Sequence, residues 1–116
     1  MDKRRELKMV YKETPRPMGV YQIKNCDNGK IFVGSSMNVP AKFNSDKFQL
    51  NYRVHRNTAL QTDWNKNSPE DFSFEVLETI KAEEIPEEYW REAVKKLEEK
   101  WLNALQPYGE KGYNKS

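Results

Sequence analysis

Tyr21 and Phe32 are the first candidates for chemistry, because the residues around them predict that two aromatic rings lie on neighbouring strands. The segments 19–21 and 32–34 are rich in β-branched and aromatic residues and flank the turn-rich stretch 25–29, Asn-Cys-Asp-Asn-Gly. An Asn-Gly step between two such segments is a strong hairpin signal. The hydroxyl of Tyr21 can hydrogen-bond a water molecule or act as a base, whereas the benzyl ring of Phe32 can do neither.

The register of this hairpin decides how close the two rings come. If Lys24 pairs with Gly29, Tyr21 lies opposite Phe32 on one face of the sheet. The turn residues alone do not fix that register. Without its neighbours, Tyr21 is equally well interpreted as a strand residue that packs in the core.

The two strands and their turn closely resemble the opening of GIY-YIG nuclease domains. The resemblance is carried by MGVYQIKN at residues 18–25 and NGKIFVGSS at residues 28–36. It implies two active-site tyrosines, of which Tyr21 matches the first, while Phe32 stands in the place of the second. It also implies hydrolysis of phosphodiesters, which needs a base to activate water, a cation near the phosphate and positive charge for the transition state.

The same resemblance covers residues 18–114 and implies further site residues. Lys42 stands where the family has an arginine; it keeps the charge but loses the bidentate fork that matches a phosphate. Asp46, one helical turn later, stands where some members have histidine, and its carboxylate adds negative charge unless it helps to hold a metal. The remaining matches are a histidine before the second helix, a metal-binding glutamate and the closing Gly-Tyr-Asn, here His55, Glu98 and Asn114.

A plain structural interpretation stands beside each of these matches. His55 is equally well an exposed loop histidine. A single carboxylate on a charged helix, such as Glu98, is usually a solvated side chain, and only the flanking motif favours a ligand for Mg²⁺ or Mn²⁺. Glu98 stands three residues before Trp101, which places it beside the buried stripe of its helix, whereas Glu99 points further outward.

Composition restricts the class of protein. A chain of 116 residues with 36% hydrophobic residues suits one small domain, and its three Trp and five Phe argue against disorder. No apolar run approaches the roughly 20 residues of a membrane span, and the N-terminus lacks the apolar region of a secretory signal. The single cysteine excludes an internal disulfide and a Cys-rich zinc site. We therefore expect a soluble, intracellular, cytoplasmic protein without a membrane partner.

Charge is distributed unevenly along the chain. Residues 1–57 contain twelve Lys/Arg and five Asp/Glu, whereas residues 58–116 contain eight and thirteen. A basic half that carries the candidate site is compatible with a polyanion such as DNA or RNA, although composition alone favours an ordinary solvated surface of mixed charge. We expect a basic N-terminal arm at 1–17, either a short helix or a mobile segment, followed by one domain at 18–116.

Local patterns predict an α/β fold with a small antiparallel three-stranded sheet and about three helices. Asn38 and Pro40 are typical of a helix start, and apolar residues recur with helical spacing up to Leu105 in the last helix. In the second helix Leu60, Trp64 and, less clearly, Ala59 are expected to face inward. The predicted strands lie at about 18–24, 30–35 and 72–78, and the helices at 40–50, 58–67 and 87–105.

Two functions are compatible with these residues. The leading hypothesis is a GIY-YIG domain with weakened or lost phosphodiesterase activity that acts by binding nucleic acid, DNA being favoured, or a protein partner. The alternative is an active Mg²⁺-dependent DNA endonuclease with a variant site, since a metal-bound water can ionise without a tyrosine base.

Overall fold

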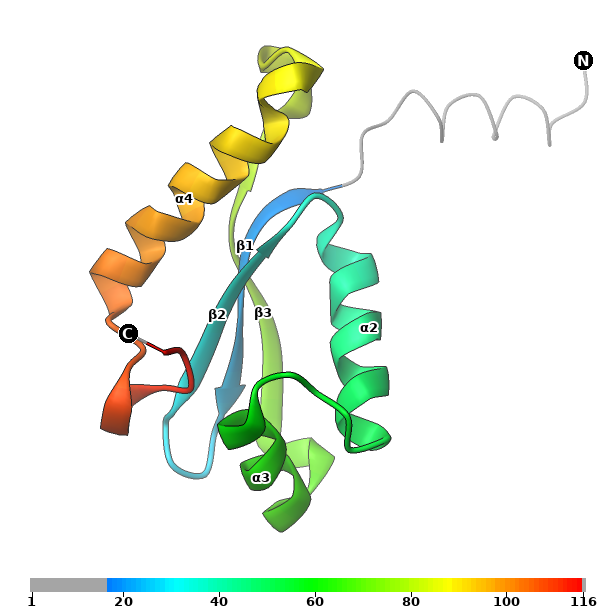
Figure 1. Cartoon of the computed structure of the whole chain (residues 1–116), viewed down its shortest axis with the longest axis vertical. Coiled ribbons are helices and arrows are strands. Elements are labelled where there is room, and N and C mark those ends of the chain that lie inside the picture. The colour runs from blue at the N-terminus through cyan, green and yellow to red at the C-terminus, as the bar shows by residue number, and fades with distance from the viewer. Residues whose placement is uncertain (1–16, 116) are drawn as a thin grey trace, which may run out of the picture.

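A computed structural model describes residues 17–115 (Figure 1). The expected arm at 1–17 lies outside the described residues except for Pro17, so its form stays a prediction. The sheet is formed by β1 (Met18–Asn25), β2 (Ile31–Ser36) and β3 (Phe72–Ile80), and the helices are α2 (Val39–Asn51), α3 (Thr58–Lys66) and α4 (Trp90–Leu105). Short 3₁₀ turns lie at Pro69–Asp71, Ala82–Glu84, Glu87–Tyr89 and Gly109–Lys111.

The three strands are antiparallel in the order β2-β1-β3. β1 is the central strand, and both of its faces are buried because helices cover the sheet on both sides, with α4 on one side and α2 on the other (Figure 1). Alternate residues of a strand face opposite sides. Tyr21 and Ile23 accordingly join the core on the side of α2 and α3, while Met18 packs with Val94 of α4.

The hairpin register differs by two residues from the pairing considered for Lys24 and Gly29. Tyr21 lies opposite Gly34, and Ile23 lies opposite Phe32. The cause is a longer loop, in which the backbone N–H of Asn25 donates to the carbonyl of Lys30. Because strand side chains alternate with a period of two, a shift of two residues keeps Tyr21 and Phe32 on the same face. Their ring centroids are 6.5 Å apart.

A β-bulge interrupts the pairing of β1 with β3. Val20 pairs with Glu78 and Tyr21 with Val76, so that Leu77 is the extra residue. Val76 keeps the face that the alternation predicts, opposite Tyr21, but it is 50% exposed. The bulge is a product of tertiary pairing, and the apolar pattern of β3 does not reveal it.

Local capping explains where the helices begin. The side chain of Asn38 accepts a hydrogen bond from the N–H of Ala41, and Pro40 follows in the first turn of α2. Asn57 caps α3 in the same way. The last helix begins later than expected, because residues 87–89 form a 3₁₀ turn before α4.

The inward faces of the helices largely agree with their sequence patterns. In α3, Leu60 and Trp64 are buried, but Ala59 is exposed and the amide of Gln61 takes an inward place instead. The predicted fold class, a three-stranded antiparallel sheet with three helices, is confirmed. No helix within residues 17–115 combines the length and the apolar character needed to cross a membrane.

Candidate active site

The seven candidate residues come together around one cavity of about 400 Å³, which lies between β2, α2, α4, the loop before α3 and the C-terminal segment. We call it the main cavity. Strands supply two of the residues, α2 and the loop after it supply three, and α4 and the C-terminal segment supply one each. They are Tyr21, Phe32, Lys42, Asp46, His55, Glu98 and Asn114.

Tyr21 is fully buried and lies across β2 at the position of Gly34. A Cβ atom on Gly34 would lie only 2.6 Å from the Tyr21 hydroxyl oxygen, so a glycine is needed for the ring to lie there. The ring also packs edge-on against Phe43, with centroids 5.3 Å apart. The hydroxyl donates a hydrogen bond of 2.9 Å to Oδ2 of Asp46. Burial, together with the Asp46 carboxylate, raises the pKa of Tyr21.

Asp46 is the centre of this polar network, although it has no solvent exposure. Besides the Tyr21 hydroxyl, it faces the ring of His55 (Oδ1 to Nε2, 3.1 Å) and the ammonium group of Lys42 (3.4 Å), one helical turn away. Burial alone raises the pKa of a carboxyl group. Here the hydrogen bond from His55, the charge of Lys42 and the Tyr21 hydroxyl outweigh burial and lower the pKa of Asp46.

His55 is buried in the loop between α2 and α3, so its interpretation as an exposed loop histidine is wrong. Its Nδ1 accepts the backbone N–H of Asn57 at 3.0 Å. Nδ1 therefore carries no proton, and the ring proton lies on Nε2, where it donates to Asp46. Both ring nitrogens are engaged, which fixes the imidazole as one neutral tautomer.

Phe32 is half-buried in the wall of the main cavity. Its ring meets the ring of His55 edge-on, with centroids 5.9 Å apart and an angle of 89° between their planes. The side chain brings no polar atom to this wall. The position of the second family tyrosine therefore contributes packing and no hydrogen-bonding group.

Asn114 holds the C-terminal segment against β2. Its Oδ1 accepts the backbone N–H of Val33 at 2.8 Å, and its Nδ2 donates to the carbonyl of Val33, also at 2.8 Å. The side-chain amide thus bonds both the N–H and the C=O of Val33, as the backbone of a neighbouring strand would. Both polar atoms of the Asn114 side chain help to position this segment.

Glu98 projects from α4 towards the end of β2. It is half-buried, and its Oε2 accepts a hydrogen bond of 2.9 Å from the hydroxyl of Ser35. Glu99, the next residue, is exposed, as expected. Within residues 17–115, no three His, Cys, Asp or Glu side chains gather into a metal-binding group. Glu98 is accordingly a single carboxylate in the wall of the main cavity.

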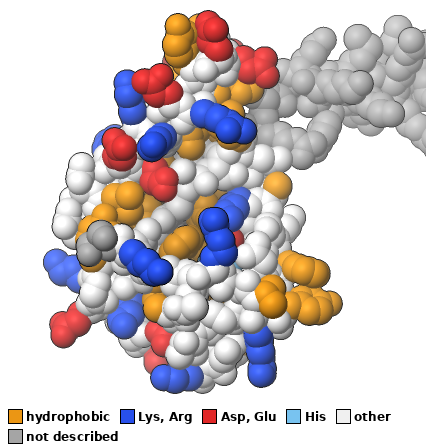
Figure 2. Space-filling model, viewed as in Figure 1, with side chains coloured by type: hydrophobic (Ala, Val, Ile, Leu, Met, Phe, Trp, Pro, Cys, Tyr) orange, Lys and Arg blue, Asp and Glu red, His pale blue; other side chains and the backbone are white. Residues whose placement is uncertain are grey.

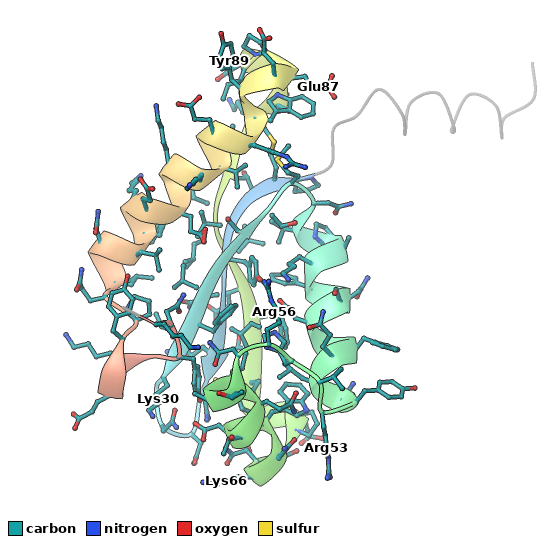
Figure 3. The ribbon with its side chains drawn as sticks, in the orientation of Figure 1. Lys30, Arg53, Arg56, Lys66, Glu87 and Tyr89 are labelled. Carbon is teal, nitrogen blue, oxygen red and sulfur yellow. The ribbon has the colours of Figure 1, made fainter. Side chains whose placement is uncertain are left out.

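Two basic residues of the main cavity have no counterpart in the sequence prediction. Arg56 and Lys115 line it together with Lys42, and both are exposed. Figure 2 shows this face with a hollow at its centre, partly lined by hydrophobic side chains and bordered by Lys and Arg side chains. In Figure 3, Arg56 lies in the space between β2 and α2. In the sequence, Arg56 directly follows His55 and Lys115 directly follows Asn114, and this adjacency to two candidate site residues is the signal that could have pointed to them.

The fold and the cavity define a small α/β domain in which a tyrosine and a glutamate face a cavity with a basic border. Residues 17–114 match the family model described as the GIY-YIG catalytic domain. The chain belongs to the GIY-YIG family.

Two kinds of relative support this assignment. Intron-associated endonuclease 1 of Enterobacteria phage T4 is 31% identical over 87 residues, which are 75% of this chain and 32% of that protein. The chain thus spans about a third of the length of this curated relative. The catalytic domain of the homing endonuclease I-TevI superposes with a TM-score of 0.69 at 30% identity, covering 85% of this chain and 98% of that one. A mutant of the same catalytic domain gives a TM-score of 0.70 at 28% identity, covering 84% and 92%.

Proposed function

We propose that this GIY-YIG domain has a degenerate active site, with weakened or lost phosphodiesterase activity, and that it acts by binding nucleic acid. The observation that carries the proposal is the hydrogen bond from the Tyr21 hydroxyl to the buried carboxylate of Asp46. A phenol that donates to a carboxylate and whose pKa is raised is a poor base for activating water.

The other candidates for a base support the same proposal. Phe32 has no oxygen, and both nitrogens of His55 are engaged by Asp46 and Asn57. The charge of Lys42 is shared with Asp46, which lowers its capacity to stabilise a phosphorane-like transition state. Loss of a single preorganised donor costs about 100-fold to 1,000-fold in rate, so these departures together predict little turnover.

Nucleic-acid binding is supported by the border of the main cavity. Arg56 and Lys115 are exposed, and within the described residues neither forms an ion pair with a carboxylate. Phosphate groups release counterions when they bind such side chains, which makes affinity fall with salt. A protein partner in place of nucleic acid predicts no such steep dependence on salt for DNA.

Among the residues of the main cavity, the carboxylate of Glu98 is the group that fits a hard divalent cation. GIY-YIG nucleases are generally metal-dependent, and Glu98 offers an oxygen, Oε1, that makes no hydrogen bond among the described residues. Mg²⁺ is often held by one or two carboxylates, with water and substrate phosphates completing its shell. When bound, Mg²⁺ or Mn²⁺ would polarise a phosphoryl oxygen, while Ser35 would keep the Glu98 carboxylate in place.

The alternative function, an active metal-dependent DNA endonuclease with a variant site, is favoured by the position of Glu98 in the same cavity as Lys42. A plasmid-cleavage assay with Mg²⁺ or Mn²⁺ separates the two functions. We expect little or no cleavage by the wild-type chain, and a gain in cleavage by Phe32→Tyr, which returns an oxygen to the cavity wall.

Glu98→Ala is the control for contaminating nucleases. Wild-type cleavage that Glu98→Ala abolishes would overturn the proposal in favour of the active enzyme. Cleavage that survives Glu98→Ala does not come from this site. Binding of duplex DNA in EDTA, followed as a function of salt, tests the binding half of the proposal independently of catalysis.

A further inference from the structure

A second groove adjoins the main cavity on the side of α4. It measures about 340 Å³ and lies between the end of β2 and α4. Its walls include Met37 after β2 and Arg91, Val94 and Lys95 of α4. We call it the α4 groove. The two hollows have Ser35 and Glu98 in common, so they meet at the hydrogen bond between these residues.

The basic residues of α4 differ in whether a carboxylate neutralises them. Lys96 forms an ion pair with Glu92 at 3.3 Å, and Lys100 forms one with Glu78 at 3.0 Å. Within the described residues, Arg91 and Lys95 form no ion pair. These two residues are the ones that line the α4 groove.

Helical spacing places the two unpaired cations together. Arg91 and Lys95 are four residues apart, so their Cβ atoms lie about 5–6 Å from each other on one face of α4. Val94 and Glu98 line the same groove, and Glu98 accepts a hydrogen bond from Ser35 of β2. Two exposed cations beside a groove that continues into a cavity with a basic border attract a polyanion that is longer than one phosphate.

We propose that Arg91 and Lys95 form a second phosphate-binding subsite, which extends the path of bound DNA from the main cavity across the end of β2 and onto α4. This inference rests on the proposed nucleic-acid binding and adds the direction in which the bound DNA runs over the protein surface. Phosphates lie on either side of Glu98, because its carboxylate repels a phosphate placed directly over it. The contacts are to the backbone, so they position DNA without reading its sequence.

The test compares two double variants that remove the same charge from the same helix. Arg91→Gln/Lys95→Gln removes the cations of the α4 groove. Lys96→Gln/Lys100→Gln is the matched control, since it removes the cations that are already paired. Binding of the full chain to a labelled 20-base-pair DNA duplex is followed by fluorescence anisotropy in EDTA between 50 mM and 300 mM salt, and thermal unfolding verifies that both variants are folded.

For duplex DNA, each phosphate contact contributes about 0.9 to the slope of log K against log salt concentration. We expect Arg91→Gln/Lys95→Gln to lower the magnitude of this slope by about 1.8, which is roughly a 60-fold loss of affinity at 0.1 M salt if the lines converge at 1 M. The control is expected to change the slope by less than about a third of that amount. Equal losses for two duplexes of unrelated sequence support backbone contacts.

If the wild type binds DNA and both double variants show the wild-type salt slope, the subsite is overturned and the proposed function stays intact. Absence of wild-type binding at 50 mM salt would overturn both. An equal loss in the two double variants also counts against the subsite, because it shows an effect of net charge and not of position.

Discussion

Replacement of Asp46 by asparagine tests whether the polar network is a structural hub. The carboxylate accepts hydrogen bonds from Tyr21 and His55 and lies 3.4 Å from the ammonium group of Lys42. Asparagine has the same shape, but its NH₂ group must face one of these donors. One charge-assisted hydrogen bond is lost, at about 1.5–3 kcal/mol, and a buried donor is left without an acceptor, at about 1–3 kcal/mol.

We therefore expect Asp46→Asn to lower the free energy of unfolding by about 3 kcal/mol, which corresponds to a decrease in Tm of about 12–24 °C for a domain of this size. Urea unfolding followed by tryptophan fluorescence measures this change, because Trp64 packs in the same core as Tyr21. Glu99→Gln, at an exposed position of α4, is the control and should stay within about 0.5 kcal/mol of the wild type.

The pH dependence of stability gives an independent measure of the same carboxylate. The pKa of Asp46 is lowered in the folded protein, so its contribution is present above the unfolded pKa of about 3.9 and is lost as pH falls through the folded value. The wild type should accordingly lose more stability than Asp46→Asn in this acidic range. A loss below 0.5 kcal/mol at pH 7, or parallel pH profiles for the two proteins, would refute the reasoning.

Two further predictions concern the walls of the main cavity. Gly34→Ala should lower the free energy of unfolding by about 1–3 kcal/mol, because the new methyl group would lie 2.6 Å from the Tyr21 hydroxyl oxygen; urea unfolding measures it, and a neutral result contradicts the described position of the ring. Glu98→Gln should raise the affinity for duplex DNA in EDTA by about 2- to 5-fold, since a surface charge contributes up to about 1 kcal/mol. Glu99→Gln is its control, and an unchanged affinity for Glu98→Gln argues against phosphates beside Glu98.

Short-range patterns in the sequence were sufficient to predict most of the elements. The Asn-Gly turn predicted the hairpin, Asn38 and Pro40 predicted the start of α2, and the apolar stripe predicted α4. These signals depend on residues within about two helical turns of each other, and they act before the chain has folded. The resemblance of motifs implied seven site residues, and the structure places all seven around one cavity.

Contacts that form only on folding decided the rest. The hairpin register depends on the hydrogen bond that closes the loop between Asn25 and Lys30, and the bulge at Leu77 depends on the pairing of β3 with β1. Neither feature changes the local pattern of apolar residues, so neither could be predicted from it.

The sequence by itself determined the elements, the family and the chemical types present at the site, including an aromatic ring without oxygen at position 32. Only the tertiary structure decided what the polar groups are bonded to. Asp46 meets Tyr21 across 25 residues of chain, and Asn114 meets Val33 across 81. Such partners are selected by packing of the sheet against the helices, because a buried donor or acceptor must find whatever group the fold places beside it.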